Sequence, residues 1–290
     1  MQTLDTSIPC KTQAQFSNQH SRNINVLKLI NSASLVSGSD DNTLKLWDFV
    51  NGVCLNTLAL ANPVLSLLLL PNGILACGLA DGSVHIIRLS DFSLLLTLKR
   101  HTARVNALEL LENGDLISGS DDGLIIGWAT NTYSEIYYLQ TEFRVSCLQR
   151  LPNNRVAMAF DFNSTFNVTI WNMNDSSVLF NFTAHDGRIN ALEYMGNDIL
   201  ASASDDTKIK LWDLKGLSSV KVLNGHTREV VALRRLPGGE LASGSFDRFV
   251  RKWDIATALP VAHIQIDTSV LALEVLGNLH ALFTGVFFFF

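Results

Sequence analysis

The stretch "SGSDDNTLKLWD" runs from Ser37 to Asp48. Asp40 and Asp41 are adjacent carboxylates placed just before a β-like run that ends in a tryptophan, which raises the question of an acid/base pair or a metal site. The stretch recurs, however, three times with small changes. The copies are "SGSDDGLIIGW" (Ser118–Trp128), "SASDDTKIKLWD" (Ser202–Asp213) and "SGSFDRFVRKWD" (Ser243–Asp254). Recurrence favours a structural unit over a single reactive site.

The copies follow a fixed period. Two degenerate copies, "CGLADGSVHII" (Cys77–Ile87) and "AFDFNSTFNVTIWN" (Ala159–Asn172), fill the gaps between the clear ones. With the tryptophan position as reference, the six copies fall at 47, 87, 128, 171, 212 and 253, in steps of 40, 41, 43, 41 and 41 residues. A constant period of this length, rich in β-formers and turn residues, indicates a propeller or a solenoid.

Each unit is expected to contain four short strands. In the third unit these are "RVNALEL" (Arg104–Leu110), "LISGS" (Leu116–Ser120), "LIIGW" (Leu124–Trp128) and "YSEIYYLQ" (Tyr133–Gln140). Apolar β-formers separated by polar turns at regular spacing are typical of an all-β fold. We find no stretch with a helical period over several turns.

These repeats resemble the WD40 family, in which a His-to-Trp-Asp unit of about 40–45 residues forms one blade of a β-propeller. The resemblance covers nearly the whole chain. It implies an all-β, seven-bladed WD40-type β-propeller in a single domain, residues 1–290. The expected repeats are approximately 20–58, 59–97, 98–139, 140–181, 182–222, 223–262 and a partial 263–290.

The last blade is expected to be incomplete or truncated. "VLALEVLGN" (Val270–Asn278) matches "INALEYMGN" (Ile189–Asn197), but "GVFFFF" (Gly285–Phe290) then replaces the expected Asp turn and Trp strand. The seventh unit is predicted to begin at about His263. Residues 1–16 are a candidate for the strand that closes this last blade.

The resemblance also implies a hydrogen-bonded set of His, Ser, Asp and Trp within a blade. A buried Trp N–H needs an acceptor, and a His ring can accept at one nitrogen while it donates from the other. We therefore expect structural networks rather than reactive sites. The four sets are His20, Ser37, Asp41 and Trp47; His101, Ser118, Asp122 and Trp128; His185, Ser202, Asp206 and Trp212; and His226, Ser243, Asp247 and Trp253.

Catalysis is not expected. The chain has no G-x-S-x-G elbow, no glycine-rich phosphate loop and no metal-ligand spacing, so the sequence predicts no catalytic residue, no metal and no cofactor. The four cysteines, Cys10, Cys54, Cys77 and Cys147, lie far apart and are typical of reduced thiols in an intracellular protein.

The charge and the apolar runs of the chain indicate which classes of partner it binds. The net charge is −5 without a basic block, which gives no indication of nucleic-acid binding. The N-terminus carries no signal peptide, and the apolar run "VLSLLLL" (Val64–Leu70) is too short to cross a membrane. We expect an intracellular, cytoplasmic protein, with the nucleus as the alternative. Sequons at Asn163, Asn167, Asn174 and Asn181 are interpreted as a polar surface region of one repeat.

One rim of the ring is the candidate partner surface. Arg104, Arg144 and Arg188 occupy matching places in three adjacent units and are expected to form a basic arc. Two interpretations remain open: the arc binds an acidic or phosphorylated peptide, or its arginines pair with neighbouring aspartates, such as Arg104 with Asp121. The other candidate rim residues are Asp40, Asp121, Asp205, Phe246 and Arg248.

The expected function is that of a non-catalytic scaffold or adaptor that binds proteins or peptides on the top face of the propeller. We expect a monomer that works in a larger complex and takes no small-molecule substrate. The alternative is the substrate-recognition subunit of an F-box- or cullin-linked ubiquitin ligase. "WDLK" (Trp212–Lys215) is loosely similar to the motif of cullin-linked WD40 receptors. A propeller enzyme or a subunit like the G-protein β chain is a third class.

Overall fold

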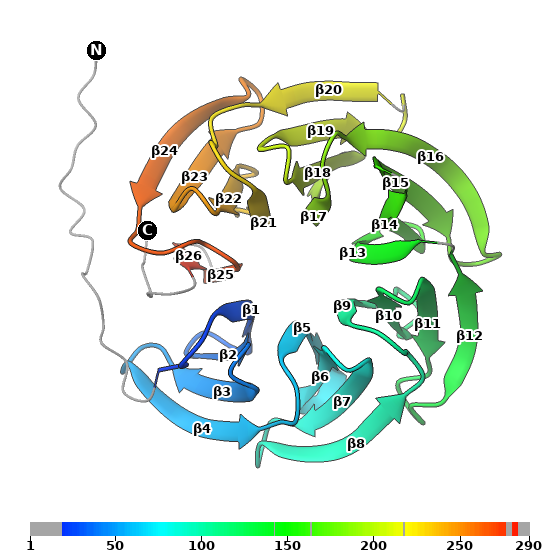
Figure 1. The fold of residues 1–290 in the computed structure, drawn as a ribbon, viewed down its shortest axis with the longest axis vertical. Coiled ribbons are helices and arrows are strands. Elements are labelled where there is room, and N and C mark those ends of the chain that lie inside the picture. Colours follow the sequence, from blue (N-terminus) through cyan, green and yellow to red (C-terminus); the bar gives the residue numbers. More distant parts are fainter. Residues whose placement is uncertain (1–18, 142, 163, 217, 277–279, 284–290) are drawn as a thin grey trace.

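Four-stranded antiparallel sheets arranged radially around an axis make up most of the structure, a computed structural model (Figure 1). The structure describes residues 19–141, 143–162, 164–216, 218–276 and 280–283. In each four-stranded sheet the strands follow one another in chain order, from the axis outward. The described residues contain no helix that is long and apolar enough to cross a membrane.

The first three blades span residues 24–140. Blade 1 contains β1 (Ile24–Leu29), β2 (Ser34–Ser39), β3 (Thr43–Asp48) and β4 (Val53–Ala59); blade 2 contains β5 (Val64–Leu70), β6 (Ile74–Leu79), β7 (Ser83–Arg88) and β8 (Ser93–Lys99); and blade 3 contains β9 (Val105–Leu110), β10 (Leu116–Ser120), β11 (Leu124–Trp128) and β12 (Glu135–Gln140). A short 3₁₀ turn, η1 (Pro71–Gly73), joins β5 to β6.

The next three blades span residues 144–265. Blade 4 contains β13 (Arg144–Leu151), β14 (Arg155–Phe162), β15 (Thr165–Asn172) and β16 (Ser177–His185); blade 5 contains β17 (Ile189–Gly196), β18 (Ile199–Ser204), β19 (Ile209–Asp213) and β20 (Ser218–Leu223); and blade 6 contains β21 (Val230–Arg235), β22 (Leu241–Ser245), β23 (Phe249–Asp254) and β24 (Leu259–Gln265).

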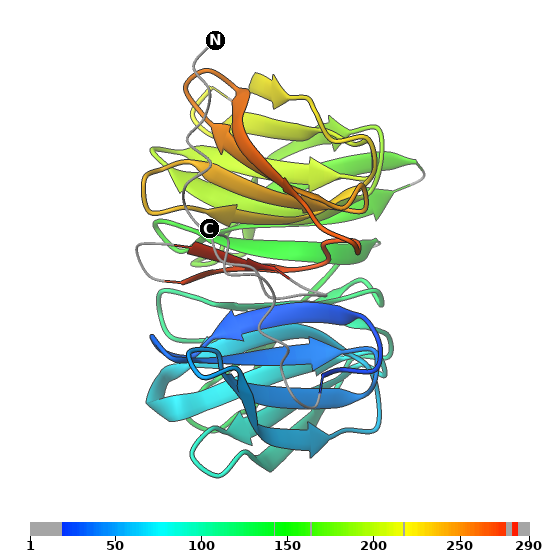
Figure 2. The same cartoon turned by 90° about the vertical axis from the view of Figure 1, so that its left-hand side faces the viewer.

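The all-β propeller predicted from the repeats is confirmed, but the number of blades is not seven. The described residues form six four-stranded blades and one two-stranded sheet, β25 (Leu273–Leu276) and β26 (His280–Phe283). Figures 1 and 2 show this sheet between blade 6 and blade 1. The last repeat lacks the Asp turn and the Trp strand that complete the other blades. The predicted closing strand in residues 1–16 and the segment Gly285–Phe290 lie outside the described residues.

The seventh unit was predicted to begin at about His263, near the end of the outer strand of blade 6. His263 lies inside β24, the outer strand of blade 6, and pairs with Arg251 of β23. Ile266, which follows that strand and is almost fully buried, donates its N–H to the carbonyl of Arg248. Leu60 and Thr141 make the equivalent bond after blades 1 and 3. The position that a His takes in four other units is therefore an isoleucine here.

The core lies between blades rather than inside a single sheet. One cluster joins Val36 and Leu44 of blade 1 to Val64 and Leu75 of blade 2, and similar clusters join each later pair. The two-stranded region takes part, because Val270 packs with blade 6 and Ala272 with blade 1. This packing explains the glycine in "SGS": a Cβ on Gly38 would lie 2.3 Å from Cγ1 of Val64.

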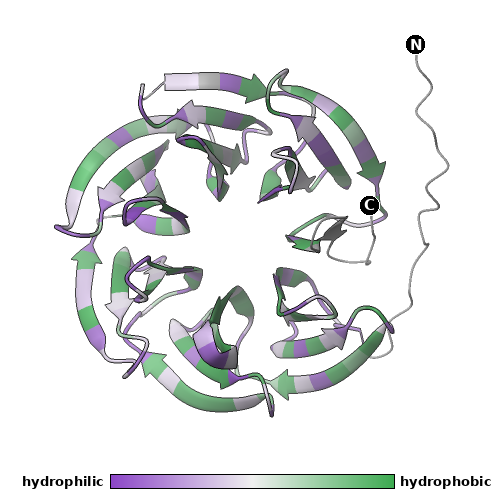
Figure 3. Ribbon diagram, turned by 180° about the vertical axis from the view of Figure 1, so that it is seen from behind, coloured by the Kyte–Doolittle hydropathy of each residue, from purple (hydrophilic) through white to green (hydrophobic). Residues whose placement is uncertain are grey.

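The outer strands carry most of the exposed apolar side chains. On β8 the three leucines Leu94, Leu95 and Leu96 are each about two-fifths exposed (45%, 39% and 41%). Figure 3 shows such apolar segments along several outer strands of the ring. The strand that faces only one neighbour thus buries less than the inner strands do.

Candidate functional site

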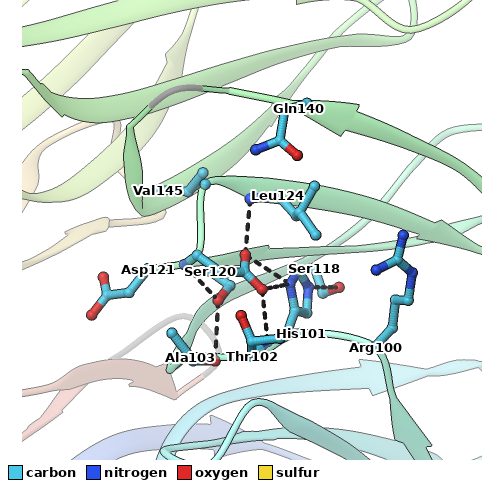
Figure 4. Close-up of polar contacts among 12 residues, drawn as sticks. Arg100, His101, Thr102, Ala103, Ser118, Ser120, Asp121, Leu124, Gln140 and Val145 are labelled. Carbon is cyan, nitrogen blue, oxygen red and sulfur yellow. Dashed lines mark hydrogen bonds and ion pairs between the residues drawn. The ribbon is translucent and has the colours of Figure 1, made fainter.

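The His, Ser, Asp and Trp of blade 3 are joined in one chain of hydrogen bonds. Figure 4 shows the part of this chain around His101 and Ser118. The indole Nε1–H of Trp128 donates to Ser118 Oγ at 2.9 Å, and Ser118 Oγ lies 2.8 Å from His101 Nε2. His101 Nδ1 lies 3.1 Å from Asp122 Oδ2. Each polar atom in this chain has a hydrogen-bond partner if the Ser118 hydroxyl donates to His101 Nε2 and His101 Nδ1–H donates to the carboxylate of Asp122.

The same chain forms in blades 1, 5 and 6. The His Nδ1–Asp distances are 2.9, 2.8 and 2.7 Å, the His Nε2–Ser distances are 2.6, 2.7 and 2.7 Å, and the Trp Nε1–Ser distances are 2.7, 2.8 and 2.8 Å for the sets headed by His20, His185 and His226. The structure thus brings together all sixteen residues of the four expected sets, blade by blade.

In the sets headed by His20, His101 and His226, the electrostatics favour a neutral ring beside an ionised carboxylate. Burial lowers the pKa of His20, His101 and His226 and outweighs the opposing effect of the nearby aspartates. Burial alone would raise the pKa of Asp206, but hydrogen bonding and charge from His185 and two backbone N–H groups lower it to about 2. The four serines are fully buried. Their hydroxyls therefore hold the tryptophans and do not face a substrate.

Blades 2 and 4 lack this network. In blade 2, Cys77 and Ile87 replace Ser and Trp and are fully buried, while Asp81 still accepts the N–H and the hydroxyl of Ser83. In blade 4, Met158 replaces Ser, and Trp171 Nε1 has no hydrogen-bond partner among the described residues. These two blades depend on apolar packing instead.

The rim aspartates are held by asparagines that the sequence analysis did not single out. Asn25, Asn106 and Asn190 each donate from Nδ2 to the aspartate fifteen residues later, at 2.7 Å; the acceptors are Asp40, Asp121 and Asp205. The same Nδ2 donates to a carbonyl at the start of the inner strand of the next blade, at 3.0, 3.0 and 3.1 Å, on Val64, Val145 and Val230. We call each of these bridges an asparagine staple.

A β-bulge places each asparagine. The inner strand skips Asn25, Asn106 and Asn190 in its pairing with the second strand. A bulged residue is unpaired and its side chain is re-aimed, so the amide reaches both the rim turn and the neighbouring blade. The signal was visible in the sequence, because the same Asn-to-Asp spacing occurs in the three units that carry a rim aspartate.

The three arginines of the predicted arc differ in their exposure and in their ion pairs. Arg104 and Arg144 are exposed, and neither forms an ion pair with a described residue. Arg188 Nε lies 3.6 Å from Asp161 Oδ2, a carboxylate that the sequence analysis did not include. Arg104 and Asp121, which the second interpretation pairs, form no side-chain ion pair; the N–H of Asp121 donates to the backbone carbonyl of Arg104.

Two further predicted rim residues lie on blade 6. The guanidinium of Arg228 lies 5.7 Å from the ring centre of Phe246. Arg248 is exposed and has a φ of 70°, a conformation that favours glycine. Gly82 and Gly123 take the equivalent turn position in blades 2 and 3, with φ of 88° and 79°. Arg248 is therefore held in a strained backbone at the rim.

A channel runs between the inner strands and encloses a cavity of about 420 Å³. Its charged lining residues are Lys28, Glu109, Glu193, Arg234 and Glu274. Within the described part of the chain, no group of three His, Cys, Asp or Glu residues could hold a metal ion. Of the cysteines, Cys54, Cys77 and Cys147 are described and are free thiols.

Comparisons with known proteins agree with this geometry. The family model "WD domain, G-beta repeat" matches residues 11–48, 92–128, 176–213 and 217–254. The chain is 28% identical over 205 residues to "p21-activated protein kinase-interacting protein 1-like" from Danio rerio, covering 66% of this chain and 52% of that protein. It is 25% identical over 134 residues to "E3 ubiquitin-protein ligase COP1" from Pisum sativum, covering 45% of this chain and 20% of that protein.

The chain thus spans about half or less of the length of these curated relatives. Among solved structures, the WD40 β-propeller domain of Doa1 superposes with a TM-score of 0.81 at 22% identity, covering 94% of both chains. At that identity the likeness concerns the fold.

Proposed function

This chain belongs to the WD40 repeat family, and on that premise we propose that it is a protein-interaction scaffold without catalysis of its own. It binds peptide segments of partner proteins across the rim formed by the starts of the inner strands and the turns between second and third strands. A fold of this kind carries many functions, so the rim residues themselves have to support the choice.

The observation that carries the proposal is the state of Arg104 and Arg144. They occupy matching places on adjacent blades, are exposed and form no ion pair with a described residue. The aspartate next to Arg104, Asp121, is engaged by Asn106. Guanidinium groups of this kind suit carboxylates and phosphates through paired N–H bonds. We propose an acidic or phosphorylated peptide as the ligand.

Arg188 and Arg248 extend this surface to blades 5 and 6. Arg188 is shared with Asp161, whose pKa is raised by burial and by the nearby Asp121 and Asp205. A ligand carboxylate or phosphate that enters here therefore competes with Asp161 for Arg188. This competition favours ligands with more than one negative charge.

Binding of labelled peptides to the full chain tests the proposal. We expect a Glu-rich or phosphoserine peptide to bind more tightly than the same peptide with neutral side chains, and the difference to shrink as salt is raised. Equal binding of the charged and neutral peptides would show that the arc does not select acidic ligands.

A second proposal concerns the two-stranded sheet between blade 6 and blade 1. We propose that residues 1–16 add a closing outer strand beside the two-stranded sheet of β25 and β26. In support, the family matches at 92, 176 and 217 each begin one residue before an outer strand, and the first match begins at residue 11. Deletion of residues 1–18 is then expected to lower Tm; an unchanged Tm would argue against a closing role.

Substrate recognition for a ubiquitin ligase is the second candidate. The observation that favours it is the similarity to a relative named as an E3 ubiquitin-protein ligase. In this role the same rim would bind the substrate and another surface would bind the ligase. Co-purification of the chain with a cullin complex supports this candidate, whereas its absence under conditions that retain rim ligands argues for the plain scaffold.

A further inference from the structure

The channel is charged at the end opposite the rim. Each inner strand places one residue there, four positions after the Val or Ile near its rim end. In chain order these residues are Lys28, Leu68, Glu109, Gln149, Glu193, Arg234 and Glu274. Glu109 also lines a second cavity of about 470 Å³ that adjoins the channel through Lys28, Leu68 and Gln149.

Charge compensation in this ring is uneven. Arg234 lies between two carboxylates, 4.0 Å from Glu193 and 3.8 Å from Glu274, and Glu193 also accepts the N–H of Arg235. Glu274 is nine-tenths buried, and its Oε2 has no hydrogen-bond partner among the described residues. Glu109 forms no ion pair with any described residue. Three carboxylates therefore share two basic groups, Lys28 and Arg234, within the channel.

The pKa of Glu109 reflects its burial and this shortage of positive charge in the channel. Burial raises its pKa to about 7; the charges of Lys28 and Arg150 lower the pKa and that of Glu193 raises it, so the basic neighbours do not offset the burial. Burial also raises the pKa of Glu193 despite the guanidinium of Arg234. A carboxylate in such a setting is ionised at little cost only when a cation comes close.

We propose that the channel end opposite the rim binds an organic cation of side-chain size, a guanidinium or ammonium group, with Glu109 as the pairing carboxylate. The cavity of about 420 Å³ lies near the lower limit of about 300–1,000 Å³ for small-molecule sites, which favours a side chain over a larger ligand. A metal ion is disfavoured, because no described group of ligands could hold one. This site goes beyond the proposed rim function and does not rest on it.

Lys28 offers the competing interpretation. Its ammonium group could swing toward Glu109 and fill the role of the ligand. Lys28 lies on β1, two blades before Glu109 on β9, and lines the same two cavities. Its charge lowers the pKa of Glu109 but does not offset the effect of burial, and the two side chains form no ion pair. An external cation that pairs directly with Glu109 would lower that pKa, which is a change that can be measured.

Calorimetric and NMR titrations of the full chain test the site. The probes are methylguanidinium, as a free cation, N-acetylarginine methylamide, as a peptide-borne one, and N-acetylcitrulline methylamide, the neutral match of the second. We expect both cations to bind and to lower the pKa of Glu109, while the citrulline compound does not bind. Tighter binding of the arginine compound than of methylguanidinium identifies a peptide as the source; equal binding identifies a free cation.

The pH dependence of probe binding provides a second test. If only ionised Glu109 binds, apparent affinity follows its ionised fraction and is about tenfold higher at pH 8 than at pH 6. Glu109→Gln is expected to abolish binding, and Glu135→Gln on the outer strand β12 to leave it unchanged. Equal affinity of the Glu109→Gln variant, or equal binding of citrulline and arginine compounds, overturns the proposal. Rim variants are expected to bind these probes as the native chain does.

Discussion

Asn106 joins two blades and the rim through a single amide nitrogen. Its Nδ2 lies 2.7 Å from Asp121 Oδ1 within blade 3 and 3.0 Å from the carbonyl of Val145 in blade 4. The staple thus fixes the rim aspartate and the neighbouring blade at once. The same relationship couples blade 1 to blade 2 and blade 5 to blade 6.

Loss of this staple is expected to destabilise the ring. Asn106→Ala removes two hydrogen bonds and leaves the Val145 carbonyl without that donor, so the free energy of unfolding should fall by about 1–3 kcal/mol. Urea denaturation measures the change. Asn62→Ala is the matched control, because Asn62 donates only to Asp81, at an exposed site, among the residues that the structure describes. Equal losses for the two variants would show that the bridge between blades adds nothing.

The tryptophans of blades 4 and 6 are expected to respond differently to the same substitution. Trp253→Phe removes a buried bond to Ser243 and leaves that hydroxyl short of a partner, whereas Trp171→Phe removes no hydrogen bond to a described residue. The first change should cost about 1–3 kcal/mol more than the second. Chemical denaturation of the two variants provides the comparison, and similar costs would contradict a stabilising role for the network.

Asp206 predicts a loss of stability in acid. Its pKa in the folded chain is about 2, below the ordinary value of 3.8, so the folded state holds the ionised form more strongly than the unfolded state does. Its contribution is complete above pH 3.8 and is lost as the pH falls toward 2. The stability difference between the native chain and Asp206→Asn should therefore shrink over that range. A difference that stays constant from pH 5 to pH 2 would refute the assignment.

Replacement of Arg248 by glycine is expected to raise the stability of the fold and to weaken ligand binding. Its backbone has a φ of 70°, so Arg248→Gly should relieve strain and raise the free energy of unfolding by about 1 kcal/mol. If Arg248 also contacts the ligand, the same variant binds acidic peptides less tightly. Thr207, at the equivalent turn with a φ of 71°, gives the control variant Thr207→Gly, which should be stabilised without a loss of affinity.

The fold was largely predictable because the repeat places the same residue types at the same spacing. The four networks follow from Ser ten residues and Asp six residues before each Trp, and the structure joins these residues as expected from the resemblance. The predicted blade count was wrong, because the match of Val270–Asn278 to another unit indicated a seventh blade, whereas the described residues after blade 6 form only a two-stranded sheet.

The contacts of the candidate site were harder to predict from the sequence than the fold. The asparagine staples depend on a β-bulge, which shows only when the strands are paired. The pairing of Arg188 with Asp161 joins blade 5 to β14 of blade 4, where the degenerate copy of the repeat hides the correspondence with the other units. The raised pKa of Glu109 depends on burial inside the channel, which a linear pattern does not reveal.

Charge reversal at two rim arginines shows whether the rim binds acidic peptides. The double variant Arg104→Glu and Arg144→Glu should weaken binding of a phosphoserine peptide at least tenfold, which is about 1.4 kcal/mol, while Tm stays close to that of the native chain. Arg150→Glu is the matched control, because Arg150 is exposed on the same strand as Arg144 but at its opposite end. A double variant that binds the peptide as tightly as the native chain, or no more weakly than Arg150→Glu, would contradict the account.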